Sequence, residues 1–158
     1  MTFFKSISIY LVVVMMLVTS CKTATLYEQN TFLPDHQWSA KTINGYQFNI
    51  EDTNSMYKVF FVIRHHNAYH YKNIWIQVDM KAPGDTLVKQ TLNLNLADDL
   101  NGWLGTGMDD IYDQRIPITP KAIKFHKGIC HFSVQHTMRE DPLQNILSTG
   151  IRVEKVRP

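Results

Sequence analysis

Cysteine is scarce in this chain. Its 158 residues include two, Cys21 and Cys130, and Cys21 directly follows an apolar leader. If Cys21 is modified at the end of this leader, Cys130 has no partner in the chain, which excludes an internal disulfide framework. Cys130 lies within an apolar strand pattern, where a free cysteine behaves as a small hydrophobic residue. We expect its thiol to be buried and unreactive.

Long apolar runs are absent as well. The firm apolar run is Ile9–Val18, whereas an uninterrupted membrane span needs about 20 residues. Its length, with Lys5 before it, is typical of a secretory signal peptide. The leader ends in Leu17-Val18-Thr19-Ser20 before Cys21, which is the pattern of a bacterial lipobox.

A lipobox cysteine receives a diacylglyceryl group through a thioether, loses the leader before it and is then often N-acylated. We therefore predict a signal peptide over residues 1–20 and lipid attachment at Cys21. Each buried methylene contributes about 0.8 kcal/mol, and several acyl chains supply a stable anchor. Cleavage by an ordinary signal peptidase, with Cys21 incidental, is the alternative.

The chain also lacks an excess of either charge. Lysine and arginine number 16 against 14 aspartate and glutamate residues, and removal of Lys5 with the leader leaves a balance of +1. This balance argues against a polyanion-binding protein, so no nucleic-acid partner is expected.

The 138 residues after the leader are enough for one domain with its own core. Residues 21–45 are polar without sustained periodicity, which predicts a lipidated N-terminus and tether whose second half packs back onto the domain. Residues 46–158 are the predicted domain. No internal repeat is visible.

Strand patterns dominate that domain. Tyr46, Phe48 and Ile50 alternate with polar residues, residues 57–64 are apolar on both faces, and residues 74–81 and 88–96 form a predicted hairpin. Further strands are expected over residues 111–118, 130–138 and 151–153, and Asp141-Pro142 predicts the start of a short helical turn. The pattern favours an all-β antiparallel sandwich, jelly-roll or immunoglobulin-like.

Residues 98–110 form a glycine-rich loop that contains Trp103, Gly105, Gly107 and Asp110. Glycines permit positive φ and tight backbone turns. The loop is either a conformationally demanding structural element or a partner-docking element. It lacks the Gly-Lys-Ser/Thr of a phosphate loop and the alternating acids of a calcium loop.

His65, His66 and His70 form the densest histidine cluster. Adjacent strand residues point to opposite faces, so one of the first two at most joins a common site. Zinc needs three or four converging ligands. A metal-dependent hydrolase is therefore the least favoured reading, and we expect no metal, no catalytic residues and no cofactor beyond the lipid on Cys21.

Carbohydrate binding is the alternative function. Trp38, Trp75 and Trp103, with Tyr46 and Tyr112, could present a sugar-stacking platform on a β-sandwich. Trp75 is the strongest candidate because it lies on the polar face of its strand. The competing interpretation is that Trp75 is covered by a second packing layer, since large aromatic residues are mostly buried.

Three segments carry a family resemblance: YHYKNIW at residues 69–75, GWLGTGMDDIYD at 102–113, and Met138-Arg139 followed by GIRVEK at 150–155. With the lipobox in front, the chain resembles the gliding-motility lipoprotein GldH family of Bacteroidota over nearly its whole length. It departs at Asp109, where the resemblance leads us to expect glycine.

The resemblance implies a non-enzymatic accessory lipoprotein of the gliding and type IX secretion machinery, with other envelope proteins as partners. Surface-displayed lipoproteins of that phylum often carry acidic residues after the cysteine, whereas Lys22-Thr23-Ala24-Thr25 has none. We therefore expect a domain that faces the periplasm.

Overall fold

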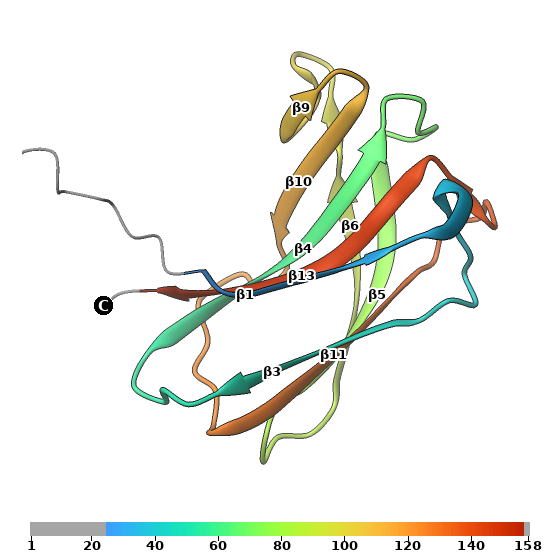
Figure 1. Cartoon of the computed structure of the whole chain (residues 1–158). Coiled ribbons are helices and arrows are strands. Elements are labelled where there is room, and N and C mark those ends of the chain that lie inside the picture. Colours follow the sequence, from blue (N-terminus) through green and yellow to red (C-terminus); the bar gives the residue numbers. More distant parts are fainter. Residues whose placement is uncertain (1–24, 157–158) are drawn as a thin grey trace, which may run out of the picture.

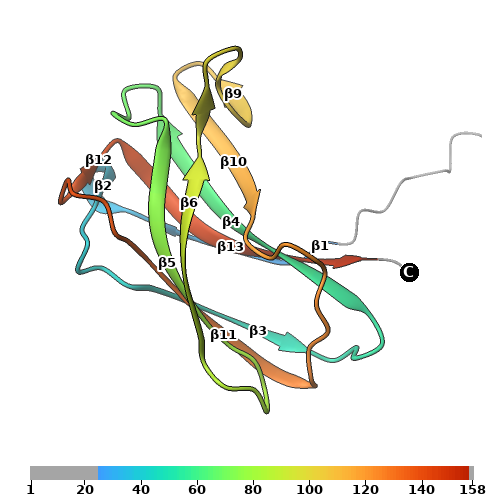
Figure 2. The same cartoon turned by 180° about the vertical axis from the view of Figure 1, so that it is seen from behind.

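The computed structural model describes residues 25–156, which form two facing antiparallel sheets (Figure 1). The five-stranded sheet has the order β1 (Thr25–Phe32), β13 (Ile146–Val156), β4 (Met56–His66), β10 (Ile111–Pro117) and β9 (Thr106–Met108). The four-stranded sheet has the order β3 (Asn44–Ile50), β11 (Gly128–His136), β5 (Asn73–Lys81) and β6 (Val88–Asn95). Figure 2 shows β5 and β6 from behind. The predicted antiparallel β-sandwich is confirmed.

Short elements complete the described chain. A single 3₁₀ turn, η1 (Pro34–His36), precedes β2 (Gln37–Trp38), which pairs with β12 (Leu143–Gln144). The strands β7 (Ala97–Asp98) and β8 (Gly102–Trp103) pair with each other beyond the end of β6.

The core follows the alternation in the sequence. Tyr46, Phe48 and Ile50 on β3 are buried, as predicted, and so are Ile74, Ile76 and Val78 on β5. The strand β4, apolar on both faces, lies between β13 and β10 in the larger sheet. Cys130 is fully buried, and burial raises the pKa of its thiol to about 11, so the expected inert cysteine is confirmed.

The predicted tether is wrong over Thr25–Phe32, whereas the expected packing of its second half onto the domain is seen in the buried Leu33 and Trp38. Thr25–Phe32 forms β1, which pairs with β13 from Thr25–Glu154 to Phe32–Ser148. Glu28 accepts hydrogen bonds from Arg115 and Arg152 on the same sheet. Burial raises the pKa of Glu28, but these hydrogen bonds outweigh it and lower the pKa to about 2. The sequence hid this strand because hydrogen bonds and ion pairs, rather than an alternating apolar face, hold it at the sheet edge.

The predicted helical turn after Asp141 is also wrong. Leu143 pairs with Trp38 in the small β12–β2 ladder, and β13 begins at Ile146. The Asp141 carboxylate accepts a hydrogen bond from the backbone N–H of Ala40, 2.8 Å away, instead of capping a helix. Apolar residues that suit one helical face are used here by two extended segments, because their partner strands lie far away in the sequence.

Candidate functional site

The glycine-rich loop projects from one end of the sandwich. We call residues 98–111 the tip; they contain β8, β9 and the turn into β10, and β9 lies at the top of Figure 1. The structure brings all four predicted loop residues, Trp103, Gly105, Gly107 and Asp110, into this one region. Cys21 lies outside the described residues, so its predicted lipidation stays a prediction.

Two glycines of the tip have a structural reason to be glycine. Gly105 has φ +91°, and a Cβ there would overlap the backbone oxygen of Asp113 and lie 3.1 Å from its carbonyl carbon. A Cβ on Gly107 would lie 2.8 Å from the ring of Tyr112. These close approaches press the β8–β9 segment against β10, so the tip is a packed hairpin.

Trp103 anchors the tip from beneath. Its half-buried ring lies 4.6 Å, centroid to centroid, from the ring of His65, 6.1 Å from Tyr112 and 6.4 Å from Tyr69. Burial raises the pKa of Tyr69, which keeps its phenol neutral. This aromatic cluster fixes the base of the hairpin.

Asp110 joins the tip to the loop between β4 and β5. Its backbone oxygen accepts a hydrogen bond from the N–H of Asn67 at 2.7 Å, and its carboxylate accepts one from the Asn67 amide at 2.6 Å. Asp110 is thus a brace between two loops at the same end of the molecule.

Three large apolar side chains are exposed on the tip, among polar neighbours such as Asp99 and Asp109. Leu100 is 95% exposed, Met108 79% and Ile111 36%. Exposed apolar side chains gathered on one projecting element are typical of contact surfaces for other proteins. The tip therefore combines a structural frame with a surface suited to docking.

We predict that Asp109→Gly stabilises the domain. Asp109 has φ +55° at the β9–β10 turn, a conformation that glycine adopts without steric cost. The free energy of unfolding should rise by about 0.5–1 kcal/mol, measured by urea titration. Asp110→Gly is the matched control and should destabilise, because it removes the carboxylate that accepts a hydrogen bond from the Asn67 amide. A lower stability for Asp109→Gly would contradict the prediction.

The three clustered histidines do not converge. The buried His65 ring contacts the backbone oxygen of His66 through Nδ1 at 3.0 Å. His66 Nε2 lies 3.8 Å from Asp110, and His70 Nδ1 lies 3.2 Å from Glu140. No group of three potential ligands is present among residues 25–156. The described histidines thus give no support to the hydrolase reading.

His136 is 1% exposed, and neither ring nitrogen has a hydrogen-bond partner within the described chain. Its Nε2 lies 4.0 Å from Asp141, and its ring meets that of Trp38 edge-on at 5.2 Å. Burial lowers the pKa of His136, and it lowers the pKa of His65 as well.

The domain should accordingly lose stability in mild acid. In the folded state His65 and His136 have pKa values below the ordinary 6.5, so the unfolded state binds protons first as pH falls. Their contribution is complete above pH 6.5 and is lost as pH drops towards their folded pKa values. Urea unfolding from pH 7.5 to 5 should show this decline, with a smaller slope for His136→Gln. A flat profile for the unsubstituted protein would contradict this origin.

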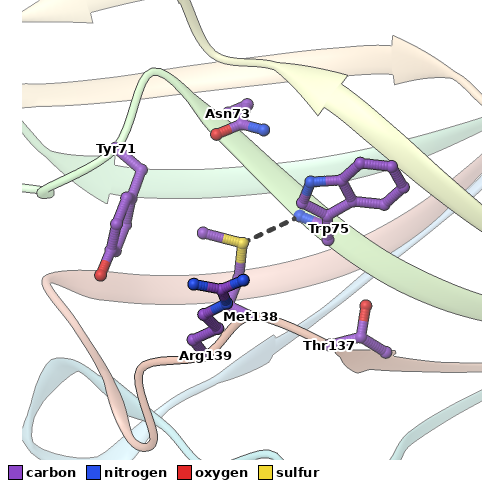
Figure 3. Close-up of a pocket in the computed structure, with 6 residues that line it drawn as sticks. All are labelled: Tyr71, Asn73, Trp75, Thr137, Met138 and Arg139. Carbon is purple, nitrogen blue, oxygen red and sulfur yellow. Dashed lines mark hydrogen bonds between the residues drawn. The ribbon is translucent and has the colours of Figure 1, made fainter.

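A second feature lies beside the tip. A cavity of about 400 Å³ is lined by Tyr71, Asn73, Trp75, Thr137, Met138 and Arg139 (Figure 3). We call it the Trp75 pocket. Tyr71 comes from the β4–β5 loop, and its ring lies 5.8 Å from that of Tyr69 in the aromatic cluster. One loop therefore connects the base of the tip to the wall of the pocket.

The predicted aromatic platform is corrected by these positions. Trp38 and Tyr46 are fully buried, and Trp103 is half-buried in its cluster. Trp75 is 42% exposed, so the interpretation that another layer covers it is wrong. The polar face of its strand gave the signal for Trp75. Sequence reasoning missed Tyr71, Asn73 and Arg139 as lining residues. Arg139 lies far from Trp75 in the sequence, and only the fold brings the two residues together.

The fold and the tip define an all-β sandwich domain with a projecting hairpin that exposes large apolar side chains. The model of the GldH lipoprotein family matches residues 25–153, and the chain belongs to that family. A lipoprotein family implies a membrane-anchored protein of the cell envelope. Within residues 25–156, no helix has both the length and the apolar character to span a bilayer.

Two relatives and one solved structure are similar. The gliding motility lipoprotein GldH homolog of Christiangramia forsetii is 24% identical over 146 residues, which cover 88% of this chain and 89% of the relative. The gliding motility lipoprotein GldH of Flavobacterium johnsoniae is 22% identical, covering 75% and 77%. Dimeric latent PorU from Porphyromonas gingivalis matches with a TM-score of 0.34 and 10% identity, over 88% of this chain and 14% of PorU.

Proposed function

We propose that this protein is a non-catalytic, lipid-anchored accessory component of the gliding-motility and type IX secretion machinery. Membership of the GldH lipoprotein family carries this proposal, since both relatives are named as gliding motility lipoproteins. The partners are other envelope proteins of that machinery, and the domain faces the periplasm.

The burial of Cys130 and the structural contacts of the clustered histidines support a non-catalytic role. Cys130 is buried with a raised pKa, which removes the thiolate that nucleophilic chemistry needs. His65, His66 and His70 each contact a different structural partner. Binding is therefore the function that the described residues support best.

The tip is the surface that we assign to partner docking. It carries Leu100, Met108 and Ile111 on a frame fixed by Gly105 and Asp110. In the five-stranded sheet, β9 lies at the edge opposite β1, the strand closest in sequence to Cys21. This arrangement presents the tip away from the anchored edge.

The sequence after Cys21 supports the periplasmic orientation. Residues 22–25 contain no acidic side chain, unlike the pattern that often accompanies display on the cell surface in this phylum. Resistance of the protein to protease in intact cells, with digestion after the outer membrane is opened, tests this orientation.

Cys21→Ser should release the protein from the membrane. Without the thiol no diacylglyceryl group can be attached, and the acyl chains that hold the protein at the bilayer are lost. Membrane fractionation and a mass spectrum of the mature N-terminus measure the outcome, and motility or secretion should fail. Normal function with a sedimenting Cys21→Ser protein would overturn the anchor.

Site-specific crosslinking tests the docking surface. A photo-crosslinking residue at Met108 should capture envelope components of the motility or secretion machinery in living cells. Ile129 is the matched control, because it is an exposed aliphatic residue, 52% accessible, in the other sheet. Equal capture at both positions, or no capture of such components at Met108, would refute docking through the tip.

A further inference from the structure

The Trp75 pocket arises where β11 leaves β5. Their ladder ends at the His136–Ile76 pair. Beyond it, the backbone N–H of Thr137 donates to the Trp75 oxygen at 2.9 Å, and the Trp75 N–H donates to the sulfur of Met138 at 3.2 Å. A sulfur atom thus occupies the place of a strand carbonyl, and the diverging backbone leaves a hollow beside Trp75.

The hollow exposes an aromatic surface in the middle of a sheet. The strand β5 has neighbours on both sides, yet the Trp75 side chain is 42% exposed. Figure 3 shows Tyr71 and Trp75 on opposite sides of Met138, with Asn73 and Thr137 near the indole. Ligand pockets commonly combine such apolar rings with a few polar groups that fix orientation.

Along the sheet, the residues that pair around Trp75 are polar and uncharged. Asn93 lies opposite Trp75 on β6, and Thr91 and Gln135 lie opposite Gln77 on the two flanking strands. Charges return further along the sheet at the Asp79–Lys89 ion pair, 3.3 Å. Protein surfaces usually mix many charged residues, so this neutral face of amides and hydroxyls suits a ligand rich in hydroxyl groups.

Two lining groups remain available for a ligand. The Asn73 amide donates to Asn93 at 2.6 Å, which fixes its orientation and leaves its own oxygen as an acceptor. Arg139 is exposed and makes no hydrogen bond or ion pair within residues 25–156. The carboxylate next to it in sequence, Glu140, is already held by Tyr71 and His70. An unpaired guanidinium beside neutral donors and acceptors selects an anionic substituent, for which a carboxylate has matching geometry.

We propose that the Trp75 pocket binds an acidic saccharide, a pyranose that carries a carboxylate. The apolar face of the ring stacks on Trp75, its hydroxyls bond Asn73 and Thr137, and its carboxylate pairs with Arg139. Strand addition by a peptide is disfavoured because the backbone N–H and oxygen of Trp75 are already engaged. This site is independent of the motility role.

Calorimetry on the full-length lipidated protein in detergent micelles tests the proposal. The probes are tetragalacturonate, tetraglucuronate and N-acetylmuramate, which share a carboxylated pyranose but differ in source. The methyl ester of tetragalacturonate keeps the ring and removes the charge. We expect at least one acid to bind, with its neutral form, or the corresponding uncharged sugar, roughly tenfold weaker.

Variants locate the binding. Trp75→Ala should abolish it, and Arg139→Gln should weaken the acid roughly tenfold without affecting the neutral form. Lys124→Gln, which removes an exposed cation outside the pocket, is the matched control and should bind normally. Failure of all three acids to bind, full binding by Trp75→Ala, or equal affinity for charged and neutral forms would overturn the proposal.

Discussion

Gly105→Ala is expected to lower the free energy of unfolding by about 2–4 kcal/mol, the range of substitutions that force strain and overlap into a packed structure. At φ +91° an L side chain is strained, and the new Cβ would overlap the backbone of Asp113. Relief requires β9 to move away from β10, because backbone cannot swing aside as a flexible side chain can. Urea titration measures the loss.

Substitutions at two other glycines distinguish the cost of backbone strain from the cost of steric overlap. Gly102 has φ +70° with nothing within 4 Å of an added Cβ, so Gly102→Ala should cost about 1 kcal/mol. Gly45 has open space and no positive φ, so Gly45→Ala should be nearly neutral. If Gly105→Ala costs no more than Gly102→Ala, the close approach to Asp113 does not hold the tip. In cells, Gly105→Ala should also abolish crosslinking at Met108.

Trp38→Ala should destabilise the domain by about 3–5 kcal/mol, the usual cost of truncating a large buried aromatic residue. Trp38 is fully buried, stacks on Phe61 at 6.4 Å and meets the His136 ring at 5.2 Å. Its indole N–H also donates to the backbone oxygen of Thr42 at 3.2 Å. Loss of these contacts should be large relative to the 5–15 kcal/mol that stabilises a typical domain.

Trp75→Ala provides the control for Trp38→Ala. The same truncation at the 42% exposed Trp75 should cost clearly less than at Trp38, because less apolar surface returns to water. Thermal unfolding of both variants compares them directly. Equal losses would mean that Trp38 is not part of the core.

The sandwich could be predicted because its central strands are patterned by burial. Tyr46, Phe48 and Ile50 face the core at every second residue. On β4 the alternate residues Val59, Phe61 and Ile63 are buried in the same way, whereas Lys58 and Arg64 on its other face meet solvent, so coverage of both faces was not found. The first strand could not be predicted in the same way. Its fixed partners, Arg115 and Arg152, lie far away in the sequence, so Glu28 looks like an ordinary surface residue until the chain is folded.

Part of the candidate site could also be predicted from the sequence, and part could not. Glycine spacing identified the tip, since close backbone approach demands glycine wherever it occurs, and Trp75 was visible as an aromatic residue on a polar face. The pocket was not visible, because it depends on where β11 stops pairing and on a sulfur of Met138 that replaces a carbonyl. A departure from regular pairing leaves no periodic signal.

The early start of β1 sets how far the domain can stand from its bilayer. With lipid on Cys21, three residues separate the attachment point from Thr25, and a fully extended chain of four steps reaches about 14 Å at most. A linker of this length would hold β1 close to the lipid headgroups. Partners that dock at the tip, as proposed above, would therefore be met near the membrane surface.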